Sequence, residues 1–141
     1  MLVEDVMTTD VATVDVGGTL RDAVGVMLER DVGSVVATTG SPPRKTGILT
    51  DSDVRRAAYE TDAALSTLAV ETYMSRPLVT VSPETSLSTA VERMRAERVK
   101  HLVVTDRMRL EGVLTAVDVA RVHDDVVSEV RRIDSRGPDW A

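Results

Sequence analysis

The sequence has no cysteine and no phenylalanine, and aromatic residues make up only 2% of it. Without cysteine there is no disulfide framework, no thiolate nucleophile and no thiolate metal site. The scarcity of aromatic residues means that the core must be built from aliphatic side chains, among which strand-favouring valine dominates. These absences exclude redox and protease chemistry that depends on cysteine.

The chain also lacks a long apolar run and an excess of positive charge. No stretch approaches the roughly 18 uninterrupted apolar residues of a membrane span. The start MLVEDVMTTD carries acids where a signal peptide carries bases, so we expect a cytoplasmic protein with no membrane partner. The net charge of −6, with Lys45 and Lys100 as the only lysines, would repel nucleic acid phosphates and argues against nucleic acid as a partner.

The chain contains an internal repeat, in which two segments align without a gap at a shift of about 67 residues. VEDVMTTDVATVDVGGTLRDAVGVM begins at Val3, and VETYMSRPLVTVSPETSLSTAVERM begins at Val70. After a loop that is two residues longer in the first copy, GILTDSDV (47–54) aligns with GVLTAVDV (112–119). Because a unit of roughly sixty residues buries little surface, neither copy should be stable without the other.

Each copy predicts the same order of elements. A short strand (11–14; 78–81) precedes a helix that Thr19 or Ser86 would cap. Two hairpin strands follow (34–38 and 46–49; 101–105 and 110–114), and then a second helix from Thr50 or Thr115. The predicted fold class is therefore α/β of the α+β kind, with two tandem βαββα units packed with pseudo-two-fold symmetry.

The predicted organisation follows from the repeat. It places the first unit at 1–60, a polar linker at 61–67, the second unit at 68–123, and a C-terminal helix extension and tail at 124–141. We expect the last helix to run to about Arg132, before Gly137 and Pro138 stop it.

The motifs D-V-M-T, T-V, T-L-x-x-A-x-x-x-M and G-I-L-T-x-x-D occur in this order, and the unit is repeated. This pattern, over about residues 2–122, resembles the cystathionine-β-synthase (CBS) domain pair, or Bateman module. The resemblance implies a stand-alone regulatory module. It would bind AMP, ADP, ATP or S-adenosylmethionine in the cleft between its units and signal to an unknown effector protein by a conformational change. It also implies a homodimer packed through helices.

The resemblance places ligand chemistry where the third strand of each copy meets the second helix. Asp53 and Asp118 would accept the ribose hydroxyls, and Thr50 and Thr115, at the helix N-termini, would face phosphate. The same Thr-x-x-Asp spacing is also that of a capping box, in which both side chains satisfy the helix's own N–H groups. Capping and ligand binding both remain open for these residues.

The two copies differ before the central strand. Lys100 and His101 stand in the second copy where the family often carries phosphate-contacting basic residues, whereas the first copy has Gly33 and Ser34. We therefore expect the second site to be the one that takes a phosphorylated ligand. The alternative is that Lys100 is a solvated residue at a strand edge and His101 is half buried.

The first strand of each copy lines the adenine pocket in the family. This resemblance adds four weaker candidates, which are also ordinary core and strand formers: Thr13, Val14, Thr80 and Val81. Val36 and Val103 stand where many family members have proline, which leaves the fold intact but departs from the family's pocket.

The sequence offers no catalytic constellation and no metal set. His101 and His123 are the only histidines, and no HExxH, P-loop or GxSxG motif occurs. We therefore expect a binding module and not an enzyme, with no cofactor beyond an adenosine-type regulatory ligand. The alternative function is a dimerisation or docking module whose pockets bind no ligand.

Overall fold

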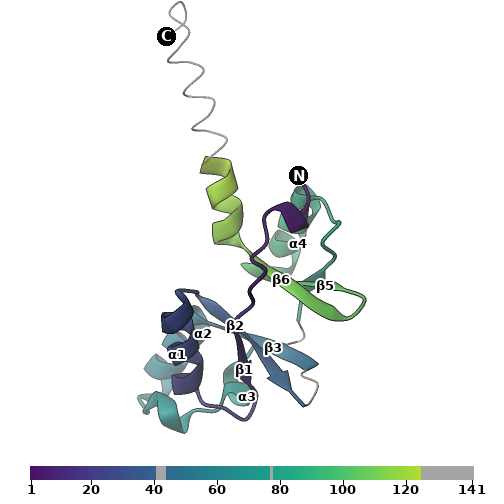
Figure 1. Cartoon of the computed structure of the whole chain (residues 1–141). Helices are drawn as coiled ribbons and strands as arrows, with labels where there is room; N and C mark the ends of the chain where they lie inside the picture. The colour runs from purple at the N-terminus through teal and green to yellow at the C-terminus, as the bar shows by residue number, and fades with distance from the viewer. Residues whose placement is uncertain (41–43, 77, 125–141) are drawn as a thin grey trace, which may run out of the picture. The chain divides into compact units, whose positions relative to one another are not determined.

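The computed structural model describes residues 1–40, 44–76 and 78–124, and both copies in it have the predicted order of elements (Figure 1). The first copy contains β1 (Thr13–Asp15), α1 (Leu20–Arg30), β2 (Ser34–Thr39), β3 (Arg44–Thr50) and α2 (Asp51–Thr61). The second contains β4 (Thr80–Val81), α4 (Leu87–Glu97), β5 (His101–Asp106), β6 (Arg109–Thr115) and a helix described over 116–124. The predicted end of that helix near Arg132, and the tail, lie outside the described residues.

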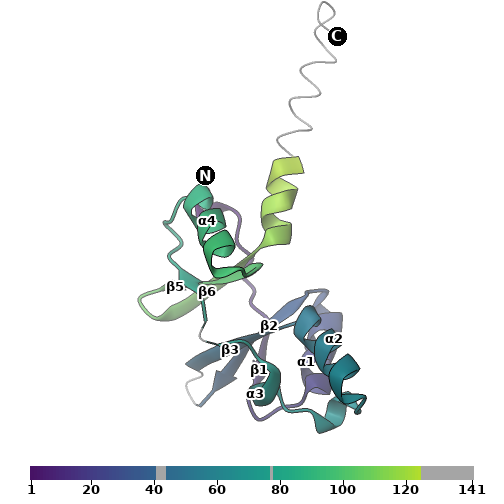
Figure 2. The same cartoon turned by 180° about the vertical axis from the view of Figure 1, so that it is seen from behind.

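Each copy forms a three-stranded sheet of the same topology (Figure 2). The orders are β1-β2-β3 and β4-β5-β6, with the first pair parallel and the second antiparallel. Even the β-bulge recurs, between Ala37 and Thr38 in one sheet and between Val104 and Thr105 in the other. The predicted α+β class and its repeated unit are confirmed.

The long helices begin where the sequence predicted, because each has a side-chain cap. The Thr19 hydroxyl accepts a hydrogen bond from the Asp22 N–H at 3.2 Å before α1, and the Ser86 hydroxyl accepts one from Thr89 before α4. Both α1 and α4 end on a non-glycine residue in the left-handed conformation, Asp31 and Arg98.

Contacts along the chain define two compact units that differ from the sequence repeats. The first-copy unit is Asp10–Val79, and the second-copy unit is Met1–Thr9 together with the chain from Thr80. The boundaries expected at 1–60, 61–67 and 68–123 describe the repeat in sequence. The packing instead assigns the segment that leads into each copy to the other copy.

This exchange rests on three short helices: η1 (Val3–Asp5), η2 (Leu65–Thr67) and α3 (Val70–Tyr73). In the second-copy unit the Val3 N–H donates to Thr85 O at 2.9 Å, and in the first-copy unit the Val70 N–H donates to Gly18 O at 3.0 Å. Val3 and Val70 are fully buried. Each leading segment therefore contributes an anchor to its unit's core, and both copies must be present in the chain to complete either unit.

The leading segments also pair with the last strand of each sheet. Thr8 bridges Val113 in β6, and Ser75 bridges Ile48 in β3. A Cβ on Gly112 would lie 2.7 Å from Thr8 O, and one on Gly47 would lie 2.8 Å from Met74 Sδ. Glycine at these equivalent positions lets the two backbones approach.

Candidate functional site

Both Thr-x-x-Asp motifs form the same structure at the start of a helix. The Thr50 N–H donates to Oδ2 of Asp53 at 3.0 Å, and the Asp53 N–H donates to the Thr50 hydroxyl at 3.2 Å. The matching distances for Thr115 and Asp118 are 3.0 and 3.1 Å. The capping interpretation is therefore correct for all four residues.

Capping uses only part of each aspartate. One oxygen, Oδ2, holds the helix, whereas no described residue donates a hydrogen bond to Oδ1 of Asp53 or Asp118. Both side chains are half buried, so they are fixed but still reach solvent. Because a carboxylate can accept about four hydrogen bonds, a cap and a ligand contact are compatible on one side chain.

The second-copy unit brings its four candidate residues together. His101 is the register partner of Thr115 across β5 and β6, and the Ala116 N–H donates to Lys100 O at 2.9 Å. Lys100 is exposed and His101 is half buried. A cationic side chain therefore starts beside the helix N-terminus that Thr115 and Asp118 cap.

The first-copy unit has an acid at the equivalent place. Ser34 pairs with Thr50, and the Asp51 N–H donates to Gly33 O at 2.9 Å. The Asp51 carboxylate occupies the space next to Gly33, since a Cβ there would lie 3.3 Å from its Oδ2. The second copy has Ala116 at this position, so the first site has an additional acid and only the second has the Lys100 cation. Asp51 was not among the residues selected from the sequence, although aligning TDSD with TAVD indicates the difference.

The weaker adenine candidates divide by strand position. Val14 and Val81 are 9% and 7% exposed and belong to the core. Thr13 is exposed and Thr80 half buried, and they pair with Val36 and Val103 on the central strands. Only the two threonines therefore have side chains that are partly accessible.

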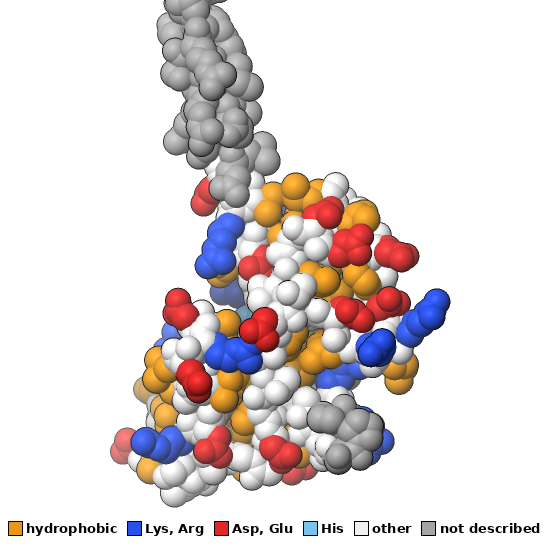
Figure 3. All heavy atoms as spheres, in the orientation of Figure 1, with side chains coloured by type: hydrophobic (Ala, Val, Ile, Leu, Met, Phe, Trp, Pro, Cys, Tyr) orange, Lys and Arg blue, Asp and Glu red, His pale blue; other side chains and the backbone are white. Residues whose placement is uncertain are grey.

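The described residues offer neither a metal site nor a membrane span. They contain no group of three or more His, Cys, Asp or Glu side chains that could hold a metal ion. None of their helices has the length and apolar character needed to cross a membrane. Acidic and basic side chains are interspersed with hydrophobic ones on the face seen in Figure 3.

Two copies of one sheet-and-helix unit, each with a capped Thr-x-x-Asp helix start, define a tandem-repeat protein with paired candidate sites. The chain belongs to the CBS domain family, whose family model matches residues 3–60 and 70–125. The resemblance drawn from the sequence motifs is thus confirmed. A CBS domain pair is a regulatory module, and this general role applies to the chain.

Relatives and solved structures support the assignment. The CBS domain-containing protein YhcV of Bacillus subtilis (strain 168) is 32% identical over 120 residues, 84% of this chain and 82% of YhcV. Homoserine O-acetyltransferase of Methanohalophilus mahii is 35% identical over 119 residues, 82% of this chain but 23% of that protein.

Two crystal structures illustrate the similarity in fold. The CBS-domain containing protein ATU1752 from Agrobacterium tumefaciens has a TM-score of 0.79 and 26% identity, covering 86% of this chain and 92% of that one. The CBS domain pair of protein MJ0100, in complex with 5′-methylthioadenosine and S-adenosyl-L-methionine, has a TM-score of 0.78 and 17% identity, covering 89% and 97%.

Proposed function

We propose that this chain is a cytoplasmic, homodimeric sensor of an adenosine-containing ligand that signals to a separate effector protein. The observation that carries the proposal is the half-buried aspartate of each Thr-x-x-Asp motif, which caps its helix with Oδ2 and has an Oδ1 to which no described residue donates. Such an oxygen suits a pair of ribose hydroxyls, because it is held in place and already partly desolvated. The adenosine ligands of the MJ0100 pair support the same ligand class.

The ligands of the two sites should differ in charge. Lys100, His101 and the helix start at Ala116 surround the second-copy site with groups that favour phosphate. At the first-copy site, the Asp51 carboxylate beside Gly33 supplies a negative charge instead. The second-copy site therefore takes an adenine nucleotide, and the first-copy site an adenosine compound without phosphate, such as S-adenosylmethionine.

Signalling follows from differential affinity. A ligand that binds one conformation of the module more tightly than another shifts the population toward it, by no more than that difference in binding free energy. The effector protein would then bind the favoured conformation.

Titration calorimetry with AMP, ADP, ATP, adenosine and S-adenosylmethionine tests the proposal. Asp118→Asn should lower the affinity for AMP about 10- to 100-fold, the loss expected for hydrogen bonds to a charged acceptor. Asp53→Asn should leave AMP binding unchanged and weaken S-adenosylmethionine binding. An absence of binding by every compound at millimolar concentration to folded protein would refute ligand sensing.

The chain supplies its own control for loss of a helix cap. Asparagine can still accept the Thr N–H through its amide oxygen, but it places a donor where Oδ1 was, so the two effects separate. Asp22 forms the same capping box with Thr19, at 2.9 Å, on a helix with no assigned ligand. Asp22→Ala should therefore lower the melting temperature and leave every affinity unchanged.

The second candidate function is a dimerisation or docking module without a ligand. It is favoured by the caps themselves, because capping alone already accounts for Thr50, Asp53, Thr115 and Asp118. In that case the aspartate substitutions would change stability, and no compound of the panel would bind.

A further inference from the structure

One segment of the second-copy unit comes from far away in the sequence. Met1–Thr9 packs with the chain from Thr80, and the whole first-copy unit lies between them in the sequence. We call Met1–Thr9 the second-copy strap, and the equivalent segment 68–76 of the first-copy unit the first-copy strap. Because a short segment at the edge of a unit can open locally, its attachment decides how readily it does so.

The second-copy strap is bonded to its unit at two places. Its first residues lie beside α4 (Figure 1), where the Val3 N–H donates to Thr85 O at 2.9 Å, in the turn after β4. Its last residues reach β6, where Thr8 and Val113 exchange two hydrogen bonds of 2.9 Å. In the sheet, β5 separates β4 from β6. The strap therefore joins two segments that do not pair with each other directly.

These two segments carry candidate ligand residues of the second copy. Thr80, a partly accessible adenine candidate, lies in β4 shortly before Thr85, and this strand is only two residues long. Thr115 follows Val113 on β6 and forms the capping box that fixes Asp118. The closed strap thus ties the turn beside the adenine candidate to the strand that ends at the ribose candidate's cap.

The two straps are anchored unequally in their cores. The first-copy strap buries three apolar side chains: Leu68, Val70 and Met74. In the second-copy strap, all of which the structure describes, only Val3 at the position of Val70 is buried. Met1 is 68% exposed, whereas Leu68 at the equivalent position is 8% exposed, and Met7 is half buried. Since burial of aliphatic surface stabilises a segment, the second-copy strap should open more readily.

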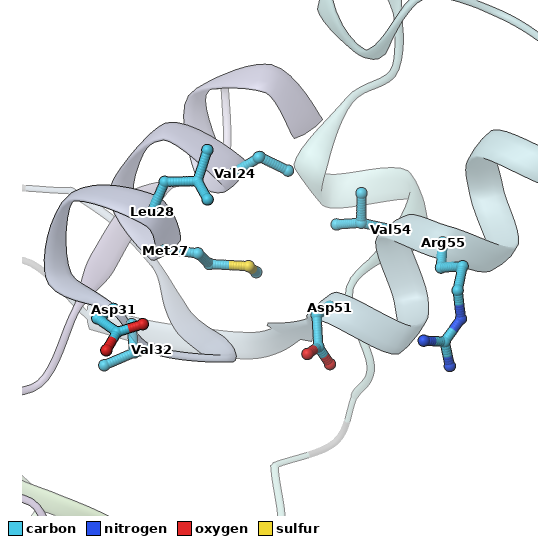
Figure 4. A pocket seen from close by; sticks show the side chains of 8 residues that line it. All are labelled: Val24, Met27, Leu28, Asp31, Val32, Asp51, Val54 and Arg55. Atoms are coloured by element: carbon cyan, nitrogen blue, oxygen red, sulfur yellow. The ribbon is translucent and has the colours of Figure 1, made fainter.

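The first-copy unit does have a hollow, but it lies away from its strap. A groove of about 350 Å³ runs between α1 and α2 (Figure 4). Its lining residues belong to these two helices or directly follow α1, and none of those described lies in the first-copy strap. The first-copy strap is therefore closely packed where it meets its unit.

We propose that the second-copy strap regulates the second-copy site: the closed strap favours binding of an adenine nucleotide, and the bound nucleotide holds the strap closed. The proposal rests on the proposed function and adds the regulation of one of its sites. When the strap opens, Val113 and the turn at Thr85 lose their backbone partners, and the segments that carry the candidate residues loosen. The apparent affinity then falls with the fraction of closed molecules, and linkage makes the effect reciprocal.

Hydrogen exchange of the full chain, followed by NMR, tests both parts. Without ligand, the Val3 and Thr8 amides should exchange about tenfold faster than those of Val70 and Ser75, the difference expected for one or two fewer buried side chains. Saturating AMP should slow exchange in the second-copy strap about fivefold and leave the first-copy strap unchanged. Equal exchange of the two ligand-free straps would overturn the unequal anchoring, and no response of the second-copy strap to AMP would overturn the regulation.

Proline substitution gives a second readout, by calorimetry with AMP. Thr8→Pro removes the N–H that bonds Val113 O and changes an exposed side chain, so the core stays intact. It should lower AMP affinity about fivefold. Ser75→Pro is the matched control, because it removes the equivalent bond to Ile48 O, at 2.8 Å, from the first-copy strap. It should leave AMP affinity unchanged.

The outcomes separate this proposal from the proposed function. If AMP does not bind the wild type, ligand sensing and the regulation both fail. If AMP binds and Thr8→Pro binds it equally well, or if Ser75→Pro causes the same loss, only the regulation by the strap is overturned. Val3→Ala, which shortens the one buried anchor, repeats the measurement should Thr8→Pro not fold, with Val70→Ala as its control.

Discussion

The first-copy and second-copy units start their second helix with the same capping box, at distances that agree within 0.1 Å. Immediately around it they differ. Gly33 and Asp51 border the first box, and Lys100 and Ala116 border the second.

This difference shows which duplicated residues the fold requires. Residues that complete a backbone contact recur, as the pairs Thr50 and Thr115 and Gly47 and Gly112 do. The charged residues that change are exposed, where a substitution costs the fold little. They are therefore positions at which the copies can take different ligands or partners.

The greatest loss of stability should come from a close backbone contact that both copies share. Gly112→Ala should destabilise the protein by about 2–3 kcal/mol, since the new methyl group would meet backbone that cannot move without loss of the β6 bridge. Gly47→Ala should cost a similar amount, because a Cβ there would lie 2.9 Å from the backbone oxygen of Ser75 as well as 2.8 Å from Met74 Sδ. Urea unfolding measures both values.

Gly25→Ala is the matched control for these glycines. Gly25 lies in α1 and a Cβ there meets nothing within 4 Å. Alanine should therefore stabilise the protein by about 0.5–1 kcal/mol through helix propensity. Equal losses at all three glycines would contradict the close approach of the leading segments.

Lys100→Ala sharpens the contrast between the sites. It should weaken AMP about tenfold at the second-copy site and leave adenosine unaffected, because only the phosphate loses a charged contact. Calorimetry with both ligands gives the comparison. A parallel loss for adenosine would mean that Lys100 acts on the structure and not on phosphate.

Giving the first-copy site the charges of the second should move the preference for AMP to it. Gly33→Lys introduces the cation. Asp51→Ala is combined with it, because a side chain at position 33 would crowd the Asp51 carboxylate. We expect AMP affinity at the first-copy site to rise about fivefold, an effect smaller than the loss at Lys100 because Ser34 still stands where the second copy has His101. No change in AMP affinity would show that the charge near Asp53 does not govern selectivity.

The caps should give effects of equal size in the two copies. Thr50→Ala and Thr115→Ala should each lower the free energy of unfolding by about 1 kcal/mol through loss of the N-cap. Thermal unfolding of the two variants measures it. A much larger loss at one threonine would show that the two boxes are not equivalent in the fold.

Much of this fold could be predicted from the sequence, because the repeat gives the same element order twice. The helix starts at Thr19, Thr50 and Ser86 were predicted from capping residues, which act locally. The short helices of the leading segments were missed. Their signal was present, since Val3 and Val70 recur at the repeat shift outside any predicted element, but no local pattern says which copy a segment packs against.

The candidate sites were only partly predictable. The spacing of Thr50 and Asp53 fits both a cap and a ligand contact, and only the geometry shows that Oδ2 holds the helix while no described residue donates to Oδ1. Asp51 was missed because an acid in the first turn of a helix is ordinary. Asp51 changes the charge of the site because its carboxylate lies beside Gly33, and the two residues come together only in the folded chain.

The central proposal is that one duplicated scaffold holds two adenosine sites of unequal charge. Its most direct test is the ratio of AMP to adenosine affinity, measured by calorimetry in Asp53→Asn and in Asp118→Asn, each of which leaves one working site. We predict a preference for AMP of at least about tenfold in Asp53→Asn, and none in Asp118→Asn. The same ratio in both variants, or no binding in either, would contradict the claim.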